Sequence, residues 1–331
     1  MKPLSPNQTP SKPLRTPRRW ACALLLLVAG IAATGCGFVG EREGTEATGG
    51  GPVDVVTTTN FITDTVREVG GSRVSVGGLM GPGVDPHLYK ASAGDVNDLR
   101  DADAVFYSGL YLEAKMQEVF EEIGESKSVF AITDEMPREE LLEPPAGAPV
   151  EEEYDPHVWF DVSLWKYAVR QVRDGLIEVD PVGANEYRRN ARDYLARLDR
   201  LDRETRRKLA TIPEGQRVLI TSHDAFRYLG KRYDLDVAAI QGLSTAAEAT
   251  TDDIERVAAV IADRGVKAVF VESSVPPQTL KAVLAAAAEQ GQDSVVGGEL
   301  FSDAAGEDGT AEGTYIGMVR SNVDKLVEGL K

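Results

Sequence analysis

Residues 185–210 contain neither Pro nor Gly and are rich in Arg, Leu, Asp and Glu, a composition typical of one long helix. Apolar residues with helical spacing mark one face of it: Tyr187, Tyr194, Leu195, Leu198 and Leu201. About 27 residues at 1.5 Å each would span roughly 40 Å, which is longer than one domain needs. The chain holds no second heptad run that could pair with this segment as a coiled-coil hairpin. We therefore expect a single helix, within residues 184–212, that crosses between two lobes.

Short β-branched or apolar runs alternate with helical stretches on both sides of this segment. Before it, the predicted strands are Val53–Thr59, Val74–Leu79, Ala104–Ser108 and Ser128–Ile132, and the predicted helices are Phe61–Val69, Ser92–Arg100, Leu112–Glu121 and Val162–Ile177. After it, the predicted strands are Arg217–Thr221, Val237–Ile240, Lys267–Val271 and Ser294–Val296, and the predicted helices are Phe226–Tyr233, Thr251–Arg264, Pro277–Gln290 and Thr314–Leu330. Such alternation predicts parallel sheets with helices on their faces. We expect an α/β fold of two lobes, residues 53–183 and 213–331, with mainly parallel sheets and one long rigid backbone helix between them.

The N-terminus has the pattern of an export signal. Residues 1–20 carry five basic residues and no acid, and an apolar run from Trp20 to Ala33 follows, too short for a permanent membrane-spanning helix. The run ends in Ala-Thr-Gly-Cys at 33–36, which resembles the cleavage site of a lipoprotein. This predicts a signal peptide over residues 1–35, a lipid on Cys36, and a Gly-rich flexible tether over 36–52. The alternative is a plain secreted protein with a free Cys.

The charge of the chain argues against nucleic acid as a partner. There are 36 Lys and Arg residues against 53 Asp and Glu, which gives a formal net charge of −17. Binding phosphates needs a clustered positive surface, so we exclude nucleic-acid binding.

The three histidines of the chain point to a metal. His87 and His157 both end the tripeptide Asp-Pro-His, and His223 follows the predicted strand 217–221 at its carboxyl end. Pro stiffens each turn, and the Asp before it can cap the turn that follows. Because ligands of α/β folds bind outside the carboxyl ends of strands, we expect the three imidazoles to meet in a cleft between the lobes. Metal ligation is favoured over three unrelated structural histidines, since neutral imidazole is the commonest metal ligand in proteins.

A fourth ligand should be a carboxylate, because the predicted folded body contains no Cys. Asp303, in a loop between the last predicted strand and the terminal helix, is the first candidate. Glu272, at the end of strand 267–271, is the second, although a buried Glu at such a place more often supports a ligand by hydrogen bonds. Asp224, beside His223, is a further candidate for a supporting role.

At this point the chain resembles a known family. Asp-Pro-His at 85–87 and 155–157, Thr221–Phe226, Phe270–Ser274 and Phe301–Asp303 occur in this order. From about residue 53 on, they resemble the metal-binding solute-binding lipoproteins of ABC importers, the zinc and manganese (TroA-like) family. The resemblance implies one metal between two lobes, held by four ligands: His87, His157, His223 and Asp303. It also implies a monomer without enzymatic activity, anchored by lipid to the outer face of the cytoplasmic membrane, whose partner is an ABC permease.

The ligand set bears on the identity of the metal. Three imidazoles and one carboxylate suit Zn²⁺, whereas Mn²⁺ prefers more oxygen ligands. The resemblance adds that residue 223 is where many manganese-selective relatives carry Glu, but the long His-rich loop of dedicated zinc binders is absent, and residues 143–153 take its place. We favour zinc over manganese, with iron third.

Two other functions stay open at this stage. A secreted zinc hydrolase could use the three histidines as ligands, with an open position for water and Glu272 as general base. Against this, the chain contains neither an HExxH motif nor a nucleophile elbow. The other alternative is a surface adhesin with a metal site.

Overall fold

A computed structural model describes residues 51–145, 148–149 and 153–331 of the chain. The predicted signal peptide, Cys36 and nearly all of the predicted tether lie outside the described residues. From residue 49 onward the chain forms one compact unit. No helix within the described ranges is both long and apolar enough to cross a membrane.

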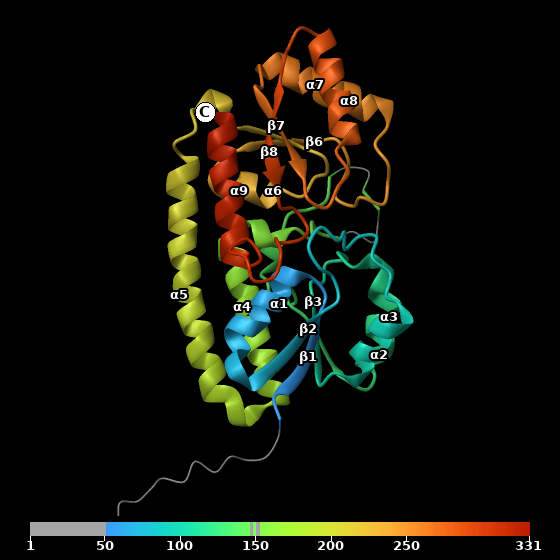
Figure 1. Cartoon of the computed structure of the whole chain (residues 1–331), viewed down its shortest axis with the longest axis vertical. Helices are drawn as coiled ribbons and strands as arrows, with labels where there is room; N and C mark the ends of the chain where they lie inside the picture. The colour runs from blue at the N-terminus through green and yellow to red at the C-terminus, as the bar shows by residue number, and fades with distance from the viewer. Residues whose placement is uncertain (1–50, 146–147, 150–152) are drawn as a thin grey trace, which may run out of the picture. The chain divides into compact units, whose positions relative to one another are not determined.

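The first sheet has four parallel strands in the order β2-β1-β3-β4. They are β1 (Val53–Thr57), β2 (Val74–Gly78), β3 (Ala104–Tyr107) and β4 (Ser128–Ala131). Helices α1 (Asn60–Gly70) and α4 (Val162–Val179) cover one face, and α2 (Ala93–Asp101) and α3 (Gln117–Gly124) cover the other (Figure 1). Neighbouring residues of β3 serve the two faces, since Phe106 packs in the core with α1 and α4 while Val105 packs in the core with α2 and α3.

The second set of strands forms two parallel pairs. These are β5 (Val218–Thr221) with β6 (Asp236–Ala239), and β7 (Ala268–Glu272) with β8 (Val295–Leu300), and β5 lies next to β7. The helices are α6 (Arg227–Tyr233), α7 (Thr251–Arg264), α8 (Gln278–Glu289) and α9 (Tyr315–Leu330). The α/β class and the parallel pairing predicted above are confirmed.

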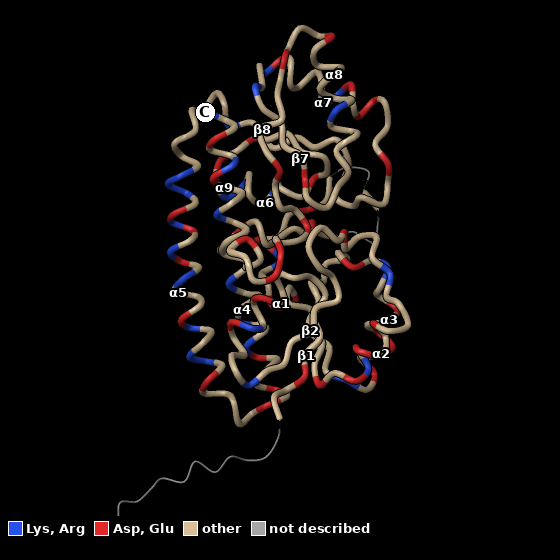
Figure 2. The backbone as a smooth tube through the Cα atoms, viewed as in Figure 1, with Lys and Arg blue, Asp and Glu red and all other residues tan. Residues whose placement is uncertain are grey.

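The predicted long helix is α5 (Ala184–Leu209), 26 residues that run along one side of the molecule (Figure 1). Near its start, Asn190 donates a hydrogen bond to the Val69 carbonyl at the end of α1, and near its end Glu204 pairs with Arg320 of α9. Tyrosines and leucines of one face are buried, while Lys, Arg, Asp and Glu alternate over the remainder (Figure 2).

The largest hydrophobic core runs through both α/β parts. It contains Val55 of β1, Tyr187 and Leu198 of α5, and Phe270 of β7, and it reaches Leu330 at the end of α9. A smaller core fills the space between the second set of strands and helices α7 and α8. The division into lobes at 53–183 and 213–331 stays a prediction, and "first lobe" and "second lobe" below name these two ranges.

Candidate metal centre

The structure brings all three histidines and Asp303 together. One ligand atom from each of these four residues lies within 4.8 Å of the others. Each side chain comes from a loop: His87 follows β2, His223 follows β5, Asp303 follows β8, and His157 precedes α4. His87 is 3% exposed and the other three are fully buried. The cluster is therefore a closed centre between the two lobes.

The spacing of the ligand atoms suits a four-coordinate ion. His87 Nε2 and His157 Nε2 are 3.4 Å apart, and His157 Nε2 lies 3.7 Å from Asp303 Oδ1. His223 Nε2 lies 3.3 Å from Asp303 Oδ2. Ligands about 2.05 Å from Zn²⁺ at the corners of a tetrahedron lie about 3.4 Å from one another. These three separations lie within a few tenths of an ångström of that value, while the four ligand atoms as a set extend to 4.8 Å.

Two buried atoms of the cluster lack a hydrogen-bond partner in the part of the chain that the structure describes. They are Asp303 Oδ1 and His223 Nε2, and the contact of the latter with Asp303 Oδ2 does not have hydrogen-bond geometry. A buried polar atom without a partner is costly, so such atoms call for an explanation. A cation bound by both atoms would supply one.

The Asp of each Asp-Pro-His tripeptide supports its histidine, and Asp155 also orients the His157 ring. Asp155 accepts hydrogen bonds from the backbone N–H of His157 and from its ring Nδ1 at 2.8 Å, so Nε2 presents its lone pair to the centre. Arg227 of α6 in turn donates to Asp155. Asp85 accepts from the backbone N–H of His87 at 2.8 Å, so both Asp-Pro-His turns are capped as predicted.

Glu272 supports His223 from the side away from the centre. Its Oε1 accepts hydrogen bonds from the backbone N–H groups of Ser222 and His223, and its Oε2 lies 2.5 Å from His223 Nδ1. With both oxygens engaged in this way, Glu272 fits the supporting role better than that of a ligand. Asp224, in contrast, faces Arg227 at 3.7 Å and makes no hydrogen bond to a ring among the described residues.

Burial and charge set the protonation of these groups. Burial lowers the pKa of His87 to about 3, so its ring is neutral at neutral pH and free to bind a metal. Burial also opposes charge on His223, but the carboxylates of Asp303 and Glu272 raise its pKa well above the usual value. For Asp303, burial favours the neutral acid, and the neighbouring His223 outweighs it and holds the pKa below its usual range.

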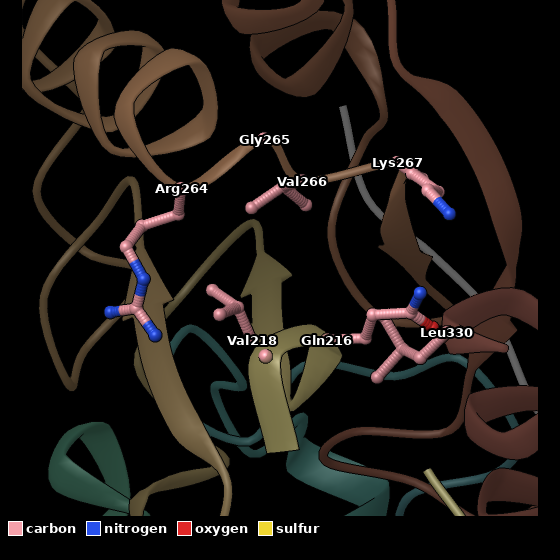
Figure 3. A pocket seen from close by; sticks show the side chains of 8 residues that line it. Gln216, Val218, Arg264, Gly265, Val266, Lys267 and Leu330 are labelled. Carbon is pink, nitrogen blue, oxygen red and sulfur yellow. The ribbon is translucent and has the colours of Figure 1, made fainter. Parts of the chain in front are cut away.

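Another cavity, of about 20 Å³, lies at the opposite end of the strands, where Val218 begins β5 and Lys267 precedes β7 (Figure 3). It has room for about one water molecule. Among the described residues that line it there is no imidazole or carboxylate, so it does not compete with the histidine cluster as a metal site.

Comparisons with known proteins agree with the resemblance seen in the sequence. Residues 55–329 match the model of the family described as zinc-uptake complex component A, periplasmic. The manganese-binding lipoprotein MntA of Bacillus subtilis is 43% identical over 92% of this chain and 97% of its own length. The zinc-binding protein TroA of Treponema pallidum is 42% identical over 95% of this chain and 99% of its own.

A solved structure of the periplasmic zinc-binding protein TroA from Treponema pallidum superposes with a TM-score of 0.81 and 45% identity, covering 85% of this chain and 99% of that one. The fold and the sequence of this chain thus agree with those of TroA over nearly the whole of residues 51–331. The chain belongs to the zinc-uptake component A family, and it is similar to TroA over most of its length.

Proposed function

We propose that this protein captures a divalent transition metal outside the cytoplasm and delivers it to an ABC permease. The observation that carries the proposal is the closed cluster of His87, His157, His223 and Asp303, with its unpartnered buried atoms. Four protein ligands around a tetrahedral ion leave no position for water or substrate, which suits capture rather than catalysis. The ion is therefore the cargo of the protein.

We favour zinc as that cargo. The three imidazoles and the single carboxylate support Zn²⁺, because Mn²⁺ prefers more oxygen ligands and a higher coordination number. The relatives do not decide the question, since one is a manganese-binding and another a zinc-binding protein.

The geometry does not favour the zinc hydrolase alternative. A hydrolase needs an open position on the metal and a free base near it. Asp303 fills the fourth corner of the cluster, and both oxygens of Glu272 are engaged by His223 and its backbone.

The anchor and the partner belong to the same proposal. A lipid on Cys36 would hold the protein at the outer face of the cytoplasmic membrane, and the tether 36–52 would let a monomer reach the permease. The names of MntA relatives as lipoproteins support the anchor. Mass spectrometry of the membrane-extracted protein tests it, and a mature N-terminus without a lipid on Cys36 would contradict it.

Metal analysis of the purified chain from residue 37 on, with chelator competition, tests the capture function. We expect one metal per chain and tighter binding of Zn²⁺ than of Mn²⁺. The triple variant H87A/H157A/H223A should lose that metal while it remains folded by circular dichroism. A wild-type protein that takes up no stoichiometric metal under these conditions would overturn the proposal.

A further inference from the structure

The loop that carries Asp303 is held at both ends by hydrogen bonds to the side-chain amides of buried asparagines. Phe301 and Ala305 lie two residues before and two residues after Asp303. Asn322 of α9 holds the first of them: the Phe301 N–H donates to Asn322 Oδ1 at 2.9 Å, and Asn322 Nδ2 donates to the Phe301 carbonyl at 2.7 Å. Both backbone groups of Phe301 are thereby satisfied by one side chain.

Asn60 holds the other end in the same way. The Ala305 N–H donates to Asn60 Oδ1 at 2.8 Å, and Asn60 Nδ2 donates to the carbonyls of Ala305 at 2.9 Å and Gly306 at 3.3 Å. Asn60 is the first residue of α1, in the first lobe, although Asp303 follows the last strand of the second. One end of the loop is therefore fixed by each lobe.

Trp159 makes a third contact, between the two ends. Its indole N–H donates to the Ser302 carbonyl at 3.0 Å, and its ring packs edge-on against His157, with centroids 5.1 Å apart. Trp159 is fully buried, as are Ser302 and Asp303. The indole thus links two members of the cluster, His157 and Asp303.

The Asp303 carboxylate depends on these backbone contacts, because it accepts only one hydrogen bond of its own among the described residues. Its Oδ1 has no hydrogen-bond partner among the described residues, and Oδ2 accepts one bond from Ser274 Oγ at 3.3 Å. The carboxylate must nevertheless lie between His157 and His223 to complete the cluster. Its position is set by the backbone of residues 301–305.

We propose that Asn60, Asn322 and Trp159 are positioning residues for Asp303 and that they tune the choice between manganese and zinc. The proposal rests on the proposed function, with Asp303 as the one oxygen ligand. Mn²⁺ needs that oxygen more than Zn²⁺ does, because Zn²⁺ can keep three imidazoles and take a water as its fourth ligand. Loosening the loop should therefore weaken manganese binding more than zinc binding.

The test compares N60A, N322A and W159F with wild type in chelator competition for each metal. We expect a ten- to hundredfold loss of Mn²⁺ affinity for N60A and N322A, the usual range for partners that orient a ligand, and a smaller loss for Zn²⁺. W159F keeps the ring packing and removes one hydrogen bond, so its loss should be the smallest. In Co²⁺-loaded N60A, the visible bands should change in position and intensity as water replaces the carboxylate.

A double-mutant cycle with D303A separates positioning from general destabilisation. If Asn60 acts through Asp303, then N60A/D303A should bind both metals as D303A does, since the two changes are not additive. The matched control is N190A, which removes one amide bond to the Val69 carbonyl, away from the cluster, and should keep both affinities. Thermal unfolding of the metal-free proteins identifies any variant that is merely unstable, and W159F still tests the idea if N60A does not fold.

The outcomes are distinguishable. Equal losses for the two metals, or a further loss on adding N60A to D303A, would overturn the positioning role and leave the proposed function intact. A D303A protein that binds like wild type would instead remove Asp303 from the ligand set. No metal bound by wild type would refute the proposed function itself.

Discussion

At the scale of single residues, the sequence singles out the side chains that carry chemistry but not those that hold them. Three histidines, two of them in copies of one tripeptide, were enough to indicate His87, His157 and His223, and the loop position indicated Asp303. Asn60 could not be found in this way, because its partner Ala305 is 245 residues away and an Asn at a helix start is common. Contacts over such a separation exist only once the fold brings the two lobes together.

Glu272 gives a prediction at this scale. Glu272→Gln should weaken metal binding by about ten- to hundredfold, because a neutral amide supports the His223 ring less well than a carboxylate. Competition titration measures the loss. Asp224→Asn is the matched control, since Asp224 neighbours His223 in sequence and faces Arg227 instead, and its affinity should stay within about threefold of wild type. An unchanged affinity in Glu272→Gln would show that the contact has no part in binding.

The protonation of His223 gives a second prediction at the scale of single residues. Asp303 and Glu272 raise its pKa well above the usual value despite burial, so in the metal-free protein the ring is protonated at neutral pH. The metal must displace that proton, and affinity should rise with pH, about tenfold per unit, until the pKa of His223 is passed. Calorimetry in buffers of different ionisation enthalpy counts the released proton. Affinity that does not change between pH 6 and 8 would contradict this assignment.

At the scale of elements, two boundaries differ from those predicted from the sequence, one at a pair of glycines and one at a 3-10 helix. The last strand was predicted to end at Val296, but β8 continues to Leu300 past Gly297 and Gly298, where the pairing with β7 shifts register. A run with two glycines reads as a turn although here it is strand. The third helix was predicted from Leu112 and begins at Gln117. The residues before it form a turn and the 3-10 helix Ala114–Met116, so the α-helix begins one turn later than predicted.

The junction between α1 and α9 carries a prediction for stability. Asp64 of α1 accepts the N–H of Tyr315, the first residue of α9, at 2.9 Å, and burial raises its pKa to about 6. The folded state therefore holds the carboxyl proton of Asp64 more tightly than the unfolded chain does. The contribution of this proton to the free energy of unfolding is full below about pH 4 and is lost as pH rises through 6. Asp64→Asn, whose amide oxygen can still accept the bond, should remove that loss.

Denaturant unfolding of Asp64→Asn and wild type at pH 4.5 and 7.5 measures the effect. The difference in free energy of unfolding between the variant and wild type should shift by about 1–2 kcal/mol in favour of the variant between pH 4.5 and pH 7.5. A difference between the two proteins that stays constant with pH would show that Asp64 does not titrate in this window.

At the scale of the whole molecule, the shared core has a consequence for unfolding. The sequence predicts two α/β lobes, yet the largest core extends from β1 to the end of α9, so the lobes are not packed independently. We expect the chain from residue 37 on to unfold in one cooperative transition. Its two tryptophans, Trp159 and Trp165, both lie in this shared core, where Trp159 donates to the Ser302 carbonyl and Trp165 stacks on Tyr315, so their fluorescence reports on that core.

Val283→Ala, in the smaller core of the second lobe, tests whether the two lobes unfold together. Val283 is fully buried in α8, in the smaller core of the second lobe, and its truncation should cost about 2 kcal/mol. If the two cores unfold as one unit, tryptophan fluorescence of the shared core and circular dichroism of the whole chain shift together to lower denaturant. If the smaller core unfolds separately, the fluorescence transition stays where it is in wild type. The coincident shift is the expected result, because β7 joins the two cores: Val269 lies in the smaller core and its neighbour Phe270 lies in the core that both lobes share.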